Sequence, residues 1–223
     1  MIMTRVYQKD DNGFFKVPFY ISNAMQELAY WIRYRRSLYK YYSLSEYVVV
    51  AEFCTLLQAK LNTKEFVLCE KQYRNFLLTP PSDLEKSRID ITIAEISKNS
   101  KIKKDELFST NNKQENGFLK DVAKVVFEVK MYDSHEDLKK DFKRLKKIKK
   151  ENKDKVITYF MLVSENKLPV EFVDAETGRQ LADIKKYKEN EYRLNVVMVK
   201  KALGGYGKKA LSKGTFICLI EVV

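Results

Sequence analysis

A pair of opposite charges in the middle of an apolar strand most restricts how this 223-residue chain can fold. Residues 121–132 read DVAKVVFEVKMY, a β-branched and aromatic run that is typical of a buried strand. Because strand side chains alternate between two faces, every second residue from Val125 to Met131 forms an apolar face, with Glu128 and Lys130 together on the other. Burying these charges is unfavourable unless they are paired or bind an ion. The segment therefore predicts a sheet core that contains a functional or ion-paired site.

The rest of the chain predicts an α/β fold with a central mixed β-sheet flanked by helices. Helix signals cover residues 23–42, 43–61 and 134–150, and strand signals cover residues 65–73, 87–96, 121–132, 155–164, 194–203 and 215–223. This order of elements is typical of sheets covered by helices. Residues 1–21 predict a short strand or arm. The polar residues 97–120 predict an exposed insertion or a mobile loop.

A second acid lies in a strand centre at residues 87–96 (SRIDITIAEI). Alternation predicts that Ile89, Ile91 and Ile93 share one face of the sheet, while Asp90 lies on the opposite face. Asp90 and Glu128 thus resemble each other in context, since both are carboxylates within otherwise apolar strands.

The helix predicted at 43–61 offers a third carboxylate. Its apolar stripe includes Val50 and Phe53, and Glu46 lies at the N-terminal end of that stripe, whereas Glu52 points away from it. Ser43 and Glu46 also have the spacing of a capping box, in which Glu46 bonds only to the Ser43 backbone. Glu46 is therefore either a cap or a site residue.

Cysteine and histidine contents exclude several chemistries. Cys54, Cys69 and Cys218 are dispersed in apolar stretches, which predicts buried thiols in a reducing cytoplasm rather than disulfides or a zinc cluster. His135 is the one histidine, which excludes sites that need two imidazoles, and its position predicts a solvated first turn of a helix. The glycines of residues 204–207 lack the spacing of a phosphate-binding loop and predict a loop between strands.

The charge balance points to an anionic partner. The chain carries 42 Lys and Arg against 30 acids, a formal charge of +12. Residues 134–155 hold ten of these basic residues against five acids, and residues 30–36 interleave arginines with Tyr and Trp. These stretches predict nucleic-acid contacts, and the alternatives are a solvated lysine face and aromatics that pack in the core. No apolar run approaches the ~18–20 residues of a membrane span, so no membrane partner is expected.

Asp90, Glu128 and Lys130 suffice for phosphodiester hydrolysis without histidine. Carboxylate oxygens are the ligands that Mg²⁺ prefers, and metal-bound water is more acidic than bulk water. A lysine beside that water can orient it and assist its deprotonation. The acid-x-Lys spacing alone is weak, since it occurs six times here, including at Asp141, but only Glu128 lies in an apolar strand.

In this context Arg88-Ile89-Asp90 followed by Glu128-Val129-Lys130 resembles the PD-(D/E)xK nuclease superfamily. The resemblance covers about residues 43–164 and implies a restriction-endonuclease-like core. It implies that Asp90, Glu128 and the Val129 carbonyl bind Mg²⁺, for which Mn²⁺ substitutes, and that Lys130 is the catalytic lysine. Many members add a glutamate from the first core helix, for which Glu46 fits best and Glu52 is the substitute. Ile89 stands where the motif has proline, and 37 residues separate Asp90 from Glu128, which implies an insertion.

The resemblance implies a single nuclease-like domain over residues 1–223. Residues 1–42 would form an N-terminal arm and helix, 43–164 the core, and 165–223 strands that complete the sheet. The expected function is a cytoplasmic, metal-dependent nuclease, foremost a DNA endonuclease, and a homodimer stays open. One alternative is a nuclease-like fold that only binds nucleic acid or forms part of a larger complex. The other is a structural or partner-binding protein, in which the charges face outward or form internal ion pairs.

Overall fold

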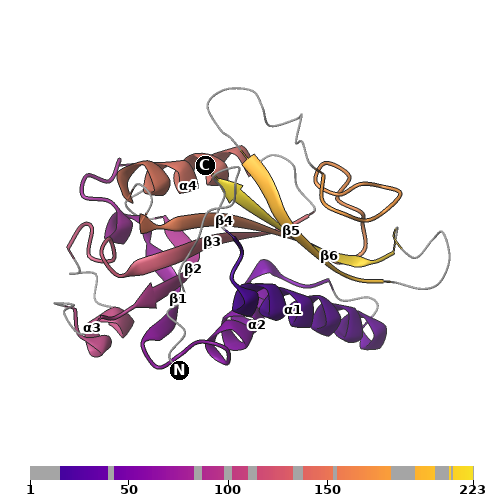
Figure 1. The fold of residues 1–223 in the computed structure, drawn as a ribbon, viewed down its shortest axis with the longest axis horizontal. Helices are drawn as coiled ribbons and strands as arrows, with labels where there is room; N and C mark the ends of the chain where they lie inside the picture. The colour runs from indigo at the N-terminus through magenta and orange to yellow at the C-terminus, as the bar shows by residue number, and fades with distance from the viewer. Residues whose placement is uncertain are drawn as a thin grey trace.

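Six strands and four α-helices account for most of the described chain (Figure 1). The structure is a computed structural model that describes residues 16–39, 43–82, 87–97, 102–109, 115–132, 138–152, 155–181, 194–203, 211 and 213–222. The elements are α1 (Phe19–Leu38), α2 (Glu46–Gln58), β1 (Glu65–Gln72), the 3₁₀ turn η1 (Tyr73–Phe76), β2 (Arg88–Glu95), α3 (Lys104–Phe108), β3 (Ala123–Met131), α4 (Leu138–Asn152), β4 (Ile157–Ser164), β5 (Leu194–Ala202) and β6 (Thr215–Val222).

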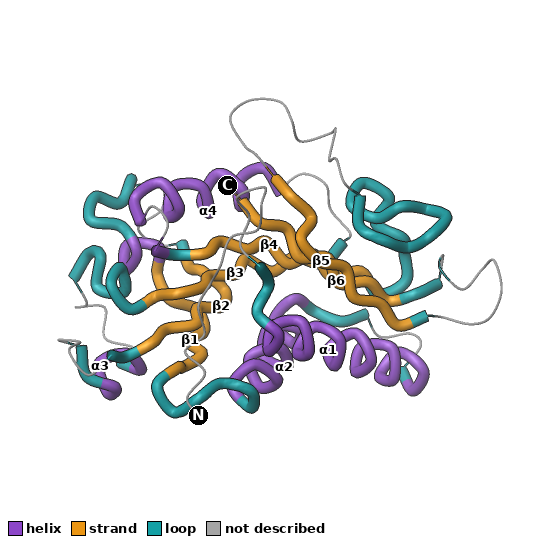
Figure 2. The backbone as a smooth tube through the Cα atoms, viewed as in Figure 1, coloured by secondary structure: helices purple, strands orange, loops and turns teal. Residues whose placement is uncertain are grey.

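The strands form one mixed sheet in the order β1-β2-β3-β4-β6-β5 (Figure 2). Only β3 and β4 are parallel, and α4 makes the connection between them; the other four pairings are antiparallel. The expected α/β fold with a central mixed sheet flanked by helices is confirmed. The last two strands extend the same sheet beyond β4.

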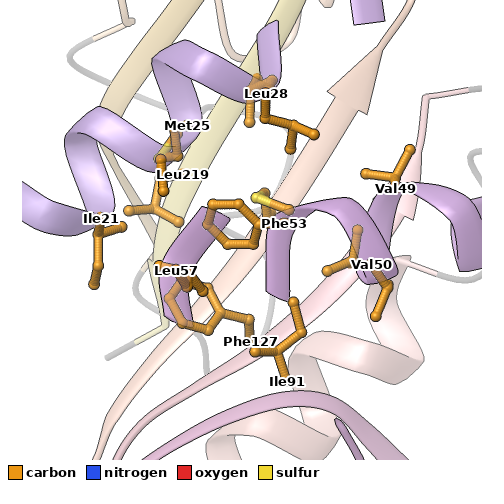
Figure 3. Close-up of a cluster of buried hydrophobic side chains, with 14 of the residues drawn as sticks. Ile21, Met25, Leu28, Val49, Val50, Phe53, Leu57, Ile91, Phe127 and Leu219 are labelled. Atoms are coloured by element: carbon orange, nitrogen blue, oxygen red, sulfur yellow. The ribbon is translucent and has the colours of Figure 1, made fainter. Parts of the chain in front are cut away.

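Helices cover both faces of the sheet. Helices α1 and α2 lie on one face and α4 lies on the other (Figure 1). The expected alternation of β3 is confirmed, because Val125, Phe127 and Val129 pack on the α1–α2 side, whereas Val126 packs on the α4 side. Figure 3 shows the hydrophobic core on the α1–α2 side, where the Phe53 ring of α2 meets the Phe127 ring edge-on at 5.7 Å between centroids.

Helix α4 has the amphipathic pattern that its sequence predicts. Leu138, Phe142, Leu145 and Ile148 are buried against the sheet. Its exposed side chains are lysines at 139, 140, 143 and 150. The outer face of α4 is therefore basic.

Two sequence expectations about chain segments are wrong. Helix α1 begins at Phe19 rather than at residue 23. Pro18 immediately precedes it with φ −59°, and its missing backbone amide costs nothing there because the first amides of a helix have no partner within it. Residues 19–21 are thus helical rather than part of an arm. The described parts of 97–120 are not simply exposed, because they contain α3 and bury Leu107 and Leu119 completely. The Leu119 amide also donates to the Asn75 carbonyl at 2.7 Å, so this segment packs on η1.

The isoleucines of β2 also depart from the expected pattern. Ile91 and Ile93 pack on the α1–α2 side, but Ile89 packs in the α4-side core that contains Tyr73. The alternation of β2 changes opposite Glu70 of β1. The φ of Glu70 is 54°, in the left-handed region, which interrupts the regular strand geometry. Within the described part of the chain, no helix is long and apolar enough to cross a membrane.

Candidate active site

Asp90 and Glu128 lie across from each other where the pairing of β2 with β3 stops. The pairing runs from Ala94–Ala123 to Ile91–Phe127, so the same register, continued by one residue, places Asp90 opposite Glu128. Beyond this point the Val129 amide donates to the Asp90 side chain instead of a backbone carbonyl of β2, with 2.6 Å between Val129 N and Asp90 Oδ2. Two acids that lie 38 positions apart in sequence therefore meet at the opened end of a strand pair.

Glu128 is buried on the α4 side of the sheet, with 4 % of its surface exposed. Its Oε2 accepts a hydrogen bond of 3.4 Å from the Tyr73 hydroxyl, and its Oε1 lies 3.9 Å from Arg144 Nη1. Burial, together with the negative charges of Asp90 and Asp141, raises the pKa of Glu128 well above its usual value. The ionised form of this carboxylate thus lacks full compensation from the protein.

Lys130 connects helices that cover opposite faces of the sheet. Its Nζ lies 3.1 Å from Glu46 Oε1 and 3.3 Å from Glu46 Oε2, on α2. It also lies 4.0 Å from Asp141 Oδ2, on α4. Burial disfavours the ammonium form, but Glu46, Asp141 and Glu128 outweigh it and raise the pKa of Lys130. Lys130 is therefore held charged among carboxylates.

Glu46 contacts Lys130 and does not cap α2. The N-cap of α2 is Ser45, whose hydroxyl accepts from the Val48 amide at 3.4 Å, and the helix begins at Glu46 itself. The expected capping box with Ser43 is therefore wrong. One residue of displacement leaves the Glu46 carboxylate available to Lys130, and of the two candidate glutamates it is Glu46, not Glu52, that makes this contact.

The chain that leads into α2 is fixed by Glu165, which follows β4. Its Oε1 accepts from the Leu44 amide at 2.5 Å, and its Oε2 pairs with Arg36 of α1 at 3.1 Å. Glu165 thereby ties the start of α2 to the end of the sheet. This contact positions the first turn of α2, and with it Glu46.

Asp141 and Arg144 of α4 also lie in the candidate site, although neither is a site residue that the sequence predicts. Asp141 is 2 % exposed, and its Oδ1 lies 3.0 Å from Arg144 Nη1. A signal was present, because Asp141 falls within the apolar stripe of α4, between Leu138 and Phe142, where a charge requires a reason. Tyr73 is also part of the site, and no sequence pattern distinguishes it from an ordinary strand-end tyrosine.

Negative charge exceeds positive charge in this cluster. Among the residues that the structure describes, this cluster holds four carboxylates (Glu46, Asp90, Glu128 and Asp141) and two cations (Lys130 and Arg144), an excess of two negative charges when all six are ionised. The pKa of Asp90 shows the consequence. Burial, with the charges of Glu46 and Glu70 in addition, raises it to about 7, although the Val129 amide favours the ionised form.

The donor atoms at this point suit a hard divalent cation. Asp90 and Glu128 supply carboxylate oxygens, and the Val129 carbonyl lies on the same edge of β3 as the amide that binds Asp90. A divalent cation would also balance the two excess negative charges. Among the residues that the structure describes, no three His, Cys, Asp or Glu side chains are arranged to hold a metal ion. The candidate set is accordingly two carboxylates and a backbone carbonyl.

The sequence also singled out one histidine, a glycine-containing segment and three cysteines. His135 and the glycines of 204–207 lie outside the described residues. Cys54 and Cys218 are buried as expected, but Cys69 is exposed, and its Sγ lies 2.9 Å from that of Cys54. Cys54 and Cys69 are 15 positions apart in sequence, so their contact between α2 and β1 could not be predicted from their spacing.

The aromatic and basic face of α1 divides between packing and exposure. Ile32 is buried and Trp31 packs against the α1–α2 core, but Tyr30 and Tyr34 are 60 % and 66 % exposed. These tyrosines are one helical turn apart and stand on the same side of α1.

Comparison of the chain with protein-family models, with curated proteins and with solved structures finds no match.

Proposed function

We propose that this protein is a metal-dependent nuclease of the PD-(D/E)xK type that hydrolyses phosphodiester bonds, with DNA as the first expected substrate. The observation that carries this proposal is the excess negative charge at the opened end of the β2–β3 pair. Asp90 and Glu128 repel each other there, and the pKa values of both are raised. A cluster with excess negative charge is electrostatically strained without a cation, and a bound cation would relieve that strain.

Each side chain has a role in this reaction. Asp90, Glu128 and the Val129 carbonyl would hold Mg²⁺ or Mn²⁺, which lowers the pKa of bound water and neutralises charge on the scissile phosphate. Lys130, held charged with its Nζ beside Glu46, would orient the attacking water and stabilise the negative charge that develops on the phosphate. Arg144 stands against Glu128 and Asp141 and keeps both carboxylates in place as positioning groups.

A polyanionic substrate agrees with the surroundings of the site. The whole chain has a formal charge of +12, although the site itself is locally negative. The exposed lysines of α4 start one residue after Leu138, in the same first turns that carry Asp141. Basic residues beside a carboxylate cluster would attract phosphates and leave the cluster free for a cation.

A second candidate is a nuclease-like fold that binds nucleic acid without cutting it. The ion pairs of Lys130 with Glu46 and of Arg144 with Asp141 favour this reading, because both cations already have partners. Among the described residues the four carboxylates of the cluster still outnumber its two cations, and this imbalance is why we favour catalysis.

The test is a cleavage assay with the full chain on plasmid, linear duplex, single-stranded DNA and RNA, in Mg²⁺ or Mn²⁺ and in excess chelator. Lys130→Met should reduce cleavage by about 100-fold or more, the scale of a lost group that stabilises charge in the transition state. The matched control is Lys124→Met on the same strand, whose Nζ pairs with Glu95 at 3.6 Å, away from the site. That variant should cut like the wild type.

Cleavage that persists in excess chelator, or that Lys130→Met retains while folded, contradicts the proposal. Salt-sensitive binding without metal-dependent cutting on every substrate would select the second candidate instead. Circular dichroism of each variant separates a lost catalytic group from a lost fold.

A further inference from the structure

Two cysteines on different elements lie in direct contact on the α1–α2 side of the sheet. Cys54 is in α2 and Cys69 is in β1, and their Sγ atoms are 2.9 Å apart across 15 positions of sequence. A disulfide bond is about 2.05 Å long, so the two sulfur atoms need to approach by about 0.9 Å to bond. Cys69 is exposed, while Cys54 lies behind it and is buried.

The two thiols are chemically unequal. The hydrogen bond with Cys54 lowers the pKa of Cys69, with a further contribution from Lys71, and outweighs the opposing effects of burial, Glu70 and Asp90. The same hydrogen bond and burial raise the pKa of Cys54. Because the thiolate is the nucleophile, the exposed Cys69 is the attacking group and Cys54 the resolving group.

We propose that Cys54 and Cys69 form a redox-active dithiol that a small-molecule disulfide such as oxidised glutathione converts into a bond between α2 and β1. The Cys69 thiolate attacks the small disulfide, forms a mixed disulfide and releases one thiolate. Cys54 then loses its proton, attacks the Cys69 sulfur and releases the second thiolate. The protein dithiol loses two electrons and two protons, and the small disulfide gains both to become two thiols.

The bond would join two elements that carry or adjoin the candidate active site. Glu46 begins the same helix that contains Cys54, and Cys69 pairs in the sheet with Ile91, the neighbour of Asp90. Oxidation would therefore fix α2 against the sheet close to the carboxylate cluster. The inference rests on the contact between the two sulfur atoms and does not depend on the proposed nuclease activity.

The experiment titrates the reduced, folded full chain with glutathione buffers that span reducing to oxidising ratios. Free thiols are then blocked with an alkylating reagent under denaturing conditions and counted by intact mass. The wild type should change from three alkylated thiols to one, Cys218, and peptide mapping should join the Cys54 and Cys69 peptides. Reducing agent should reverse the change. The oxidised protein should also unfold at a temperature several degrees higher, because the crosslink restricts the unfolded chain.

Substitutions separate the two roles. Cys54→Ala should stop at the mixed disulfide, so glutathione remains on Cys69, whereas Cys69→Ser should stay unmodified in the native state. Cys218→Ser is the matched control and should form the same disulfide as the wild type. Three alkylated thiols at every glutathione ratio, a disulfide that uses Cys218, or an unmodified Cys69 in Cys54→Ala would overturn the proposal. The wild-type mass and mapping require no variant, so a substitution that fails to fold leaves the test intact.

Discussion

Replacing Asp90 with asparagine should stabilise this protein at alkaline pH although it removes a central group of the candidate site. Asparagine has the same shape, and its Oδ1 can still accept the hydrogen bond that Asp90 Oδ2 takes from the Val129 amide. The substitution therefore removes a charge and keeps the packing. Its effect on stability reports the electrostatic strain of the cluster, and no substrate is required to measure it.

The pKa of Asp90 sets the magnitude and the sign. Burial and neighbouring acids raise this pKa in the folded state from 3.8 to about 7. Because the folded state binds the proton more tightly, the stabilisation by that proton is complete below about pH 4 and is lost as pH rises through about 7. A shift of about 3 units corresponds to about 4 kcal/mol of unfolding free energy in total. Between pH 5 and pH 8 the wild type should lose roughly 2–3 kcal/mol from this group alone.

The assay is urea unfolding at pH 5 and pH 8, in chelator, for the wild type and Asp90→Asn. The stability difference in favour of the variant should grow by roughly 2–3 kcal/mol from pH 5 to pH 8. Asp121→Asn is the matched control, because Asp121 is an exposed acid beside β3 whose pair with Lys155 is solvated. Its difference from the wild type should stay within about 0.5 kcal/mol at both pH values. A difference for Asp90→Asn that is constant or falls with pH would refute a strained carboxylate at this position.

Three further predictions test the site and the core. At pH 8, millimolar Mg²⁺ should raise the melting temperature of the wild type but not of Asp90→Asn, and equal shifts in both would place the ion elsewhere. Arg144→Met should lose about 1.5–3 kcal/mol of unfolding free energy, because Glu128 and Asp141 lose their cation, whereas the exposed neighbour Lys143→Met should not. Equal urea midpoints for these two variants would argue against that role. Leu119→Ala should lose roughly 2–5 kcal/mol, and the exposed Leu38→Ala should lose little, if residues 115–120 belong to the core as the burial of Leu119 indicates.

Local periodicity accounts for the features that the sequence predicted well. The two faces of β3, the buried stripe of α2 and the amphipathic α4 all follow from side-chain spacing within one element. Asp90, Glu128 and Lys130 were found for the same reason, since each is a charge at a position whose neighbours are apolar. The antiparallel register of β2 and β3, which the sequence did not predict, places Asp90 across from Glu128.

Contacts between elements decided everything else. Asp141 enters the site because α4 crosses the sheet face beneath Glu128, and Glu46 enters because Ser45 rather than Ser43 caps α2. Cys54 and Cys69 looked dispersed along the chain, yet the packing of α2 on β1 brings their sulfur atoms together. A sequence pattern encodes which face of an element is buried, because burial follows the repeat of that element alone. Which side chains meet across two buried faces depends on the crossing of helices and the point at which strands separate, and only the folded chain determines these.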